Sequence, residues 1–287
     1  MTLIRFQSKS GPRLAWRIGE EAIDLSIAAP GSPNDAGDWL RAGLTFDAAR
    51  QAAQRAGAEA RMPLSDLQFL PPTANPGKII CLGVNYVDHA AEGGMAKPDF
   101  PVIFYRAATT FVAHGQPIVR PRVSDKLDYE GELAAIIGEK ARHVPRARAH
   151  EIVAGYSIFN DGSIRDYQRR TAQWTIGKNF DGTGGFGPGF VPAAALPPGA
   201  KGLKLQTRLN GQVMQEANTA DMVFDIAETI AILTECMTLE PGDVLVMGTP
   251  AGVGAARNPP VFMKPGDVCE IEIEGIGILR NPIVQEN

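Results

Sequence analysis

The sequence predicts an α+β fold rich in β-strands, with a small N-terminal α/β domain over residues 1–70 and a larger domain over residues 71–287. Two observations support this fold class. Glycine supplies 31 and proline 22 of the 287 residues, which favours many turns and short strands over a helical bundle. The proline-rich run 70–77 cannot be helical, because each proline restricts its own backbone and that of the preceding residue, so the domain boundary is placed there.

The N-terminal segment is expected to contain short strands over residues 3–6, 13–18 and 22–25, because apolar runs alternate there with Gly- and Pro-containing turns. Residues 46–60 are rich in Ala, Gln and Arg and predict a helix.

The larger segment is expected to be dominated by strands. Its clearest helix spans residues 222–236, where apolar side chains recur at helical spacing. The predicted strands are residues 78–83, 133–138, 152–159, 244–247 and 268–273. Pro-Gly-Asp turns precede the last two of them.

Composition narrows the functional class. The net charge of −4 argues against a nucleic-acid scaffold or a basic membrane surface, because both need an excess of Lys and Arg. The sequence has neither a signal-peptide pattern nor a run of about 18 uncharged apolar residues that would span a membrane. Cys81, Cys236 and Cys269 lie in apolar surroundings, are odd in number and form no Cys-x-x-Cys pair, so buried thiols in a cytoplasmic protein are expected.

A carboxylate cluster precedes the predicted strand 133–138. Alternate side chains of a strand share one face, so Glu130 and Glu132, and with them Asp128, would point the same way. Like charges beside a buried strand repel, and a hard cation such as Mg²⁺, Ca²⁺ or Mn²⁺ would offset that repulsion. An exposed acidic strand end is the alternative.

Asp161 ends the next apolar strand and favours the metal interpretation. Neighbouring strands lie about 4.8 Å apart, so a third carboxylate would reach the same place if the two strands are close in the sheet. Three acidic ligands without Cys or His suit Mg²⁺ or Mn²⁺ better than Zn²⁺.

An acid/base pair is the second candidate feature. On a helix, His89 and Glu92 would be neighbours at i and i+3, and the carboxylate would raise the basicity of the imidazole. Gly93 and Gly94 follow and would let the segment hinge like a lid. An incidental surface pair is the alternative.

Two glycine-rich segments, 177–188 and 248–254, complete the candidate features. The second follows a predicted strand and could bring backbone N–H groups to an anionic substrate, although it matches neither a Walker loop nor a dinucleotide-binding pattern. Lys178 lies in the first, and Arg165 lies just beyond Asp161. Plain turns and surface charges are the alternatives.

Taken in order, these segments resemble the fumarylacetoacetate hydrolase family. The matching motifs span residues 78 to about 280: Gly83-Val84-Asn85-Tyr86-x-Asp88-His89-x-x-Glu92, Tyr129-Glu130-Gly131-Glu132-Leu133, Asn160-Asp161-x-Ser163-x-Arg165-Asp166-x-Gln168, Gly177-Lys178-x-Phe180-Asp181, Gly187-Pro188, Leu209-Asn210-Gly211 and Gly248-Thr249-Pro250-x-Gly252-Val253-Gly254. Each motif alone is weak, but seven in the family's order are specific.

The resemblance implies a mixed β-roll and a homodimer. It implies that the three carboxylates hold Mg²⁺ or Mn²⁺ and that His89 and Glu92 are the acid/base pair on a mobile lid. It also implies that a small-molecule oxo-acid substrate contacts four pocket residues: Arg165, Gln168, Lys178 and Thr249.

The reaction expected from the resemblance is hydrolysis of a C–C bond in a β-diketo acid, such as an acylpyruvate or a diketo sugar acid. His89 would activate water, and Lys178 would help to hold the enolate charge. A decarboxylase or a keto–enol isomerase would use the same site without an attacking water. A non-catalytic organic-acid-binding protein is the alternative from another class.

Overall fold

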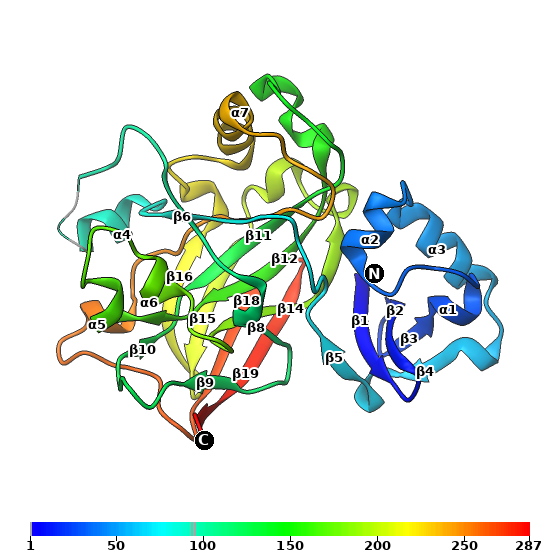
Figure 1. Ribbon diagram of the computed structural model, residues 1–287, viewed down its shortest axis with the longest axis horizontal. Coiled ribbons are helices and arrows are strands. Elements are labelled where there is room, and N and C mark those ends of the chain that lie inside the picture. The colour runs from blue at the N-terminus through cyan, green and yellow to red at the C-terminus, as the bar shows by residue number, and fades with distance from the viewer. Residues whose placement is uncertain (1, 93, 95) are drawn as a thin grey trace.

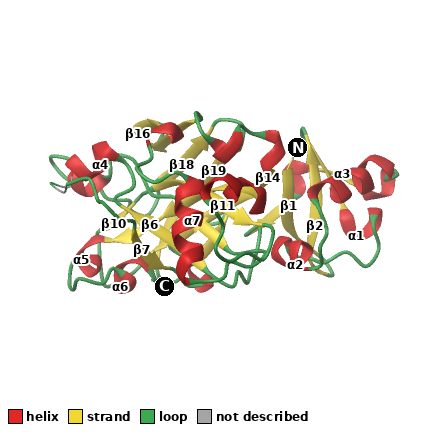
Figure 2. Ribbon diagram, turned by 90° about the horizontal axis from the view of Figure 1, so that it is seen from above, coloured by secondary structure: helices red, strands yellow, loops and turns green. Residues whose placement is uncertain are grey.

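The computed structural model describes residues 2–92, 94 and 96–287. Figures 1 and 2 show a sheet-rich body with the N-terminal segment at one end and the helices α4, α5 and α6 at the other. The N-terminal segment contains β1 (Thr2–Ser8), β2 (Gly11–Ile18), β3 (Glu21–Asp24), α1 (Leu25–Ala28), α2 (Ala36–Arg41), α3 (Phe46–Arg55), β4 (Arg61–Pro63) and β5 (Gln68–Leu70).

The remaining elements surround the candidate site. The helices are α4 (Val87–Glu92), α5 (Arg165–Gln168), α6 (Thr175–Lys178) and α7 (Ile226–Cys236). The strands are β6 (Ile79–Gly83), β7 (Val102–Tyr105), β8 (Phe111–Ala113), β9 (Ile118–Arg120), β10 (Leu127–Asp128), β11 (Gly131–Ile137), β12 (Val153–Asp161), β13 (Ser163–Ile164), β14 (Gly184–Pro192), β15 (Lys204–Leu209), β16 (Gln212–Asn218), β17 (Val244–Val246), β18 (Val268–Ile273) and β19 (Gly277–Gln285).

The largest sheet has 12 strands and follows the order β4-β3-β2-β1-β14-β12-β11-β17-β6-β7, with β5 and β8 pairing at its side. It is mixed, because β17 pairs parallel with β6 but antiparallel with β11. A second sheet has five strands in the order β16-β15-β18-β19-β9. The β-rich α+β class expected from the sequence is therefore confirmed.

The strand β11 is buried along its whole length and separates two cores. Its odd-numbered apolar residues Leu133, Ala135 and Ile137 pack in one hydrophobic cluster, whereas Ala134 and Ile136 pack in another. A strand covered on both faces needs a continuous apolar run rather than an alternating one. This explains the uninterrupted apolar sequence that follows Glu132.

Several element bounds differ from the expected ones. The helix expected over 46–60 ends at Arg55, and the helix expected over 222–236 begins at Ile226. The side chain of Asp225 caps this second helix by accepting the Glu228 N–H, while Met222 pairs with Tyr86 in an isolated bridge. Cys81 and Cys269 are buried as expected, but Cys236, at the end of α7, is exposed.

The N-terminal segment continues the main sheet. Strand β1 pairs with β14 at Leu3 and Phe190, and one hydrophobic cluster contains side chains from both parts, among them Trp16 and Ile136. The proline-rich segment 70–77 is fixed by Asp35, which accepts hydrogen bonds from the Thr73 hydroxyl at 2.9 Å and the Ala74 N–H at 2.6 Å. The domain division near residue 70 stays a prediction.

None of the helices in the described residues is long and apolar enough to cross a membrane.

The two Pro-Gly-Asp turns share one geometry. In each, the aspartate carboxylate accepts the N–H of the residue three positions earlier, at 2.8 Å, and the glycine has a positive φ. Asp243 is fully buried and also accepts the Lys78 N–H at 2.9 Å and contacts its Nζ at 2.7 Å. It therefore joins β6 to β17, next to the strand that carries the carboxylates.

We predict that Asp243→Ala lowers the free energy of unfolding by about 2–4 kcal/mol, because it removes a buried carboxylate that accepts two backbone N–H groups and contacts the Lys78 ammonium. Urea unfolding measures this change. Asp267→Ala is the matched control. It disrupts the other turn in the same way, but Asp267 does not join two strands of the main sheet, so this substitution should lower the free energy of unfolding by less. Equal losses would show that Asp243 acts only as a turn residue.

Candidate metal centre and active-site cavity

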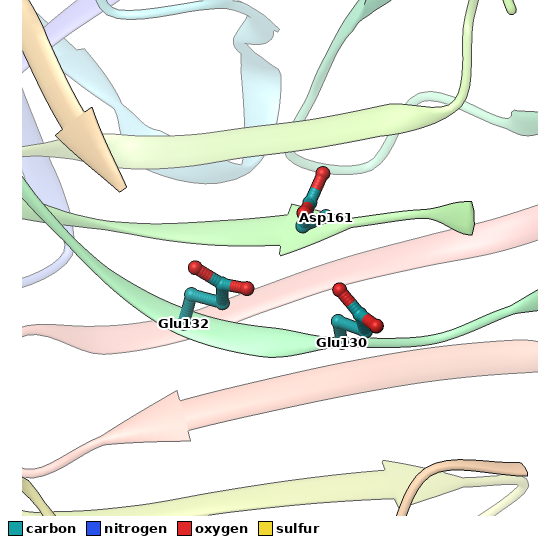
Figure 3. Close-up of side chains that lie close together, drawn as sticks. All are labelled: Glu130, Glu132 and Asp161. Atoms are coloured by element: carbon teal, nitrogen blue, oxygen red, sulfur yellow. The ribbon is translucent and has the colours of Figure 1, made fainter. Parts of the chain in front are cut away.

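The register of β11 and β12 brings three carboxylates together. Gly131 pairs with Asn160, and the Asp161 N–H donates to the Glu130 carbonyl at 2.9 Å, so the start of one strand lies beside the end of the other. Glu130, Glu132 and Asp161 are all buried, and one carboxylate oxygen from each lies within 4.8 Å of the others. Figure 3 shows the three side chains rising from these two strands toward a common space.

Three buried cations surround two of these carboxylates. The Lys178 Nζ lies 2.5 Å from Glu130 and 2.6 Å from Asp161. The Arg165 guanidinium lies 2.7 Å from the other oxygen of Glu130, and Arg106 pairs with the other oxygen of Asp161. Burial opposes ionisation of Glu130, but Lys178 and Arg165 outweigh it and lower its pKa to about 2.

Glu132 lacks such a partner. Within the described part of the chain its carboxylate forms no ion pair, and its one hydrogen-bond donor is the Gly248 N–H at 2.6 Å. Burial, Asp161 and Glu130 together raise its pKa well above the ordinary value. Ionised Glu132 is therefore costly in this arrangement.

The donor set fits a hard divalent cation. Carboxylate oxygens are the ligands that Mg²⁺ and Mn²⁺ prefer, and each oxygen can accept more than one contact. The buried cluster contains four carboxylates, including Asp128 beside Arg165, but three cations. A divalent cation held by Glu130, Glu132 and Asp161 would supply the charge that Glu132 lacks.

The predicted acid/base pair lies in the same cavity. His89 Nδ1 is 3.4 Å from a Glu92 carboxylate oxygen, and both residues belong to α4. The other Glu92 oxygen accepts the Gly252 N–H at 2.9 Å, which fixes the end of α4 against the loop after β17. Of the proposed hinge, Gly94 has a positive φ of 68°, and Gly93 lies outside the described residues.

The glycine-rich loop 248–254 donates backbone hydrogen bonds to carboxylates of the protein itself. Its N–H groups at Gly248, Gly252 and Gly254 donate to Glu132, Glu92 and Asp128 respectively. The expectation that these groups reach an anionic substrate is therefore wrong for these three donors. They position side chains of the site instead.

Thr249 and Gln168 line the cavity, but the Thr249 hydroxyl and the Gln168 side-chain oxygen already have protein partners. The Thr249 hydroxyl donates to the Gly131 carbonyl at 3.1 Å and accepts from the Gln215 amide at 2.8 Å. The Gln168 carbonyl accepts from Arg165 at 2.9 Å. In this arrangement both residues orient neighbours of the carboxylates, and their contact with substrate stays a prediction.

The cavity has a volume of about 620 Å³ and brings the two sets of residues together. The three carboxylates, Lys178, His89 and Glu92 lie on its polar side. Leu82, Phe104 and Trp174 form an apolar wall, with the Phe104 and Trp174 rings in edge contact at 5.6 Å. The cavity thus combines anion-binding and apolar surfaces, which suits a small organic acid.

Sequence reasoning missed Arg106, and it quoted Asn160 without giving it a role. Arg106 follows a strand that had not been predicted and has no motif around it. The Asn160 side-chain oxygen accepts the Glu130 N–H at 3.0 Å, which fixes the start of β11. The position of Asn160, directly before Asp161 in the sequence, was the one feature that could have indicated its role.

We predict different effects for two neutral substitutions in the metal-free protein. Glu130→Gln should lower the free energy of unfolding by about 1–3 kcal/mol, because it removes the carboxylate that Lys178 and Arg165 share and leaves each of them one acidic partner, Asp161 and Asp128 respectively. Glu132→Gln should not lower it, because it removes an uncompensated charge. Urea unfolding in EDTA measures both, and similar losses in the two variants would contradict the charge assignment.

Added Mg²⁺ or Mn²⁺ should raise the stability of the wild-type protein by about 2.7 kcal/mol at a concentration of 100 Kd. Glu132→Gln should remove this gain, because it removes one of the three charged ligands. Thermal unfolding with and without metal measures the gain in stability for the wild type and for the variant. An undiminished gain in the variant would exclude Glu132 as a ligand.

Comparison with known proteins places this site in a family. Residues 78–284 match the model described as "Fumarylacetoacetate (FAA) hydrolase C-terminal". Oxaloacetate tautomerases from Xenopus laevis and Homo sapiens are each 38% identical, over 99% of this chain and 90% and 92% of theirs.

Solved structures of related proteins share this fold over the full length of the chain. The fumarylacetoacetate hydrolase of Exiguobacterium antarcticum is 34% identical with a TM-score of 0.86, and the maleylpyruvate hydrolase of Sphingobium sp. SYK-6, in complex with manganese(II) and pyruvate, is 31% identical with a TM-score of 0.81. Each match covers 100% of both chains. The chain therefore belongs to the fumarylacetoacetate hydrolase family.

Proposed function

We propose that this protein is a divalent-metal-dependent enzyme that forms the enolate of a 2-oxo acid, and that its reaction is keto–enol interconversion of a four-carbon oxo diacid such as oxaloacetate. The observation that carries the proposal is the single cavity lined by both the three carboxylates and the His89–Glu92 pair. The homodimer, which the family resemblance implies, and the cytoplasmic location, which the cysteine content suggests, stay predictions.

The cation held by the three carboxylates would act as a Lewis acid toward the oxygens of the 2-oxo acid head. The chain's own residues do the rest. His89, oriented by Glu92, takes a proton from the carbon next to the carbonyl. Lys178 donates a hydrogen bond toward the oxygen on which charge develops. The net change moves one proton from carbon to oxygen.

The relatives support this choice among the family's reactions. The oxaloacetate tautomerases match 99% of the chain at 37–38% identity, whereas the maleylpyruvate hydrolase is 31–32% identical. The apolar wall also gives the reacting carbon a surface from which water is partly excluded. A proton transfer between substrate atoms needs no water in the cavity.

Hydrolysis of a C–C bond in an acylpyruvate-like diketo acid is the second candidate. The His89–Glu92 pair can equally take a proton from water, and the maleylpyruvate hydrolase structure shares the fold over its whole length. In that reaction water adds to the distal carbonyl, the C–C bond breaks, and two acids are released.

Product analysis separates the candidates. The metal-loaded protein should accelerate the loss of the enol absorbance of oxaloacetate without releasing CO₂ or a second acid. Two acids from an acylpyruvate, with no effect on oxaloacetate, would favour the hydrolase, and CO₂ release would favour a decarboxylase. Metal binding without turnover of any oxo acid would favour a non-catalytic binding protein.

The role of the acid/base pair generates a further prediction. His89→Ala should lower kcat by roughly 10²–10⁴-fold while leaving Mn²⁺ affinity unchanged, because the imidazole moves a proton and does not hold the metal. Glu92→Gln should do less harm, because the amide keeps hydrogen-bonding groups toward His89 and Gly252. Steady-state kinetics and Mn²⁺ titration measure these effects.

Asp88→Asn is the control for this pair, because Asp88 is exposed on the same helix and is not among the cavity-lining residues. It should leave both kcat and Mn²⁺ affinity unchanged.

The double variant of His89 and Glu92 should lose about as much kcat as His89→Ala alone, since paired residues act as a unit. Additive losses would show that the two act independently, and lost Mn²⁺ binding would make His89 a ligand.

A further inference from the structure

Arg169 lies at the mouth of the active-site cavity. It immediately follows α5, lines the cavity, and is exposed to solvent, so its side chain stands where the cavity opens. Its N–H donates to the Arg165 carbonyl at 3.2 Å, which continues the helical turn. Residues at i and i+4 of such a turn have Cβ atoms about 5–6 Å apart. Arg169 is thereby placed one helical turn from the arginine that holds Glu130.

The charge of Arg169 is not used by the protein. Arg165 and Lys178, the other two cations that line the cavity, are each bound to buried carboxylates. Across the described residues, the Arg169 side chain forms neither an ion pair nor a hydrogen bond. Four carboxylates line this cavity, and an arginine at its mouth that has no ionic partner among the described residues can attract an anion there without giving up an ion pair.

We infer that Arg169 binds the distal carboxylate of a dicarboxylic 2-oxo acid, and so determines the preference of this enzyme for diacids over monoacids. The inference rests on the proposed function and deepens it, because it names the substrate feature that the cavity mouth recognises. The 2-oxo acid head lies at the three carboxylates, and the second carboxylate extends toward the opening. A guanidinium can donate two parallel N–H hydrogen bonds to a carboxylate at that end.

The effect of Arg169 is limited by its exposure. Solvent screens an exposed ion pair, so the contribution is smaller than that of a buried arginine. The ion pair between Arg169 and the distal carboxylate also adds no interaction at the reacting carbon. It should therefore change the binding of diacids and leave the binding of monoacids untouched.

Oxaloacetate and pyruvate are a matched pair of probes, since both carry the 2-oxo acid head and only oxaloacetate carries the distal carboxylate. Calorimetric titration of the Mn²⁺-loaded protein, with freshly dissolved oxaloacetate, gives Kd for each. Wild type should bind oxaloacetate roughly three- to tenfold more tightly than pyruvate, the range set by one exposed charge-assisted contact. Arg169→Gln should abolish this preference and leave the Kd of pyruvate unchanged.

Arg170→Gln is the control, because Arg170 is the adjacent exposed arginine, stacks on Tyr167 at 3.6 Å and does not line the cavity. It should retain the preference for oxaloacetate. The inference is overturned if wild type does not prefer the diacid, if Arg169→Gln keeps the preference, or if it weakens both ligands equally. A diacid preference that depends on Arg169, without turnover of oxaloacetate, would uphold the inference and refute the proposed reaction.

Discussion

Glu130, Glu132 and Asp161 are held in one buried place by the hydrogen-bond register of β11 and β12, and their mutual repulsion is the constraint on which the rest of the site depends. Lys178, Arg165 and Arg106 offset the charges of Glu130 and Asp161, but Glu132 receives only a backbone N–H. An incompletely balanced cluster of this kind is a poor source of stability but a good receptor for a cation. An additional positive charge at this site would balance the cluster.

The surrounding fold both buries this cluster and fixes its side chains. Asn160 secures the start of β11, the loop after β17 donates N–H groups to three carboxylates, and the hydrophobic clusters pack both faces of the strand. Glu92 joins α4, which carries the candidate acid/base pair, to the same loop through Gly252. The loop therefore couples the candidate metal centre to the candidate base, so a change in its backbone should affect both.

The sequence predicted the carboxylate cluster because its cause is local. Alternation at the start of β11 places Glu132 on the same face as Glu130, the residue before the strand, and a following apolar strand that ends in Asp161 completes the set. The spacing of His89 and Glu92 on one helix is equally local. Lys178 was noted in a glycine-rich segment, and the family resemblance placed it in the substrate pocket. Its contacts with Asp161, 17 residues away, and with Glu130, 48 residues away, could not be read from periodicity.

Other features depend on tertiary contacts and could not be read from local pattern. The glycine-rich segment before Pro188 was expected to be a loop, but residues 184–192 form β14. Glycine is required there because a Cβ at Gly189 would lie 2.5 Å from the Leu3 carbonyl oxygen, and one at Gly185 would lie 2.8 Å from Asn281 Oδ1. Arg106 was missed for a similar reason, since its partner Asp161 is 55 residues away.

The most direct test of the metal centre is a crystal structure of the Mn²⁺-soaked protein, measured at a wavelength where manganese scatters anomalously. The account predicts one buried anomalous peak in contact with carboxylate oxygens of Glu130, Glu132 and Asp161, at about 2.1 Å, close to the distance at which Mg²⁺ binds oxygen ligands. A peak elsewhere, or a peak that leaves Glu132 without contact to the metal, would contradict it.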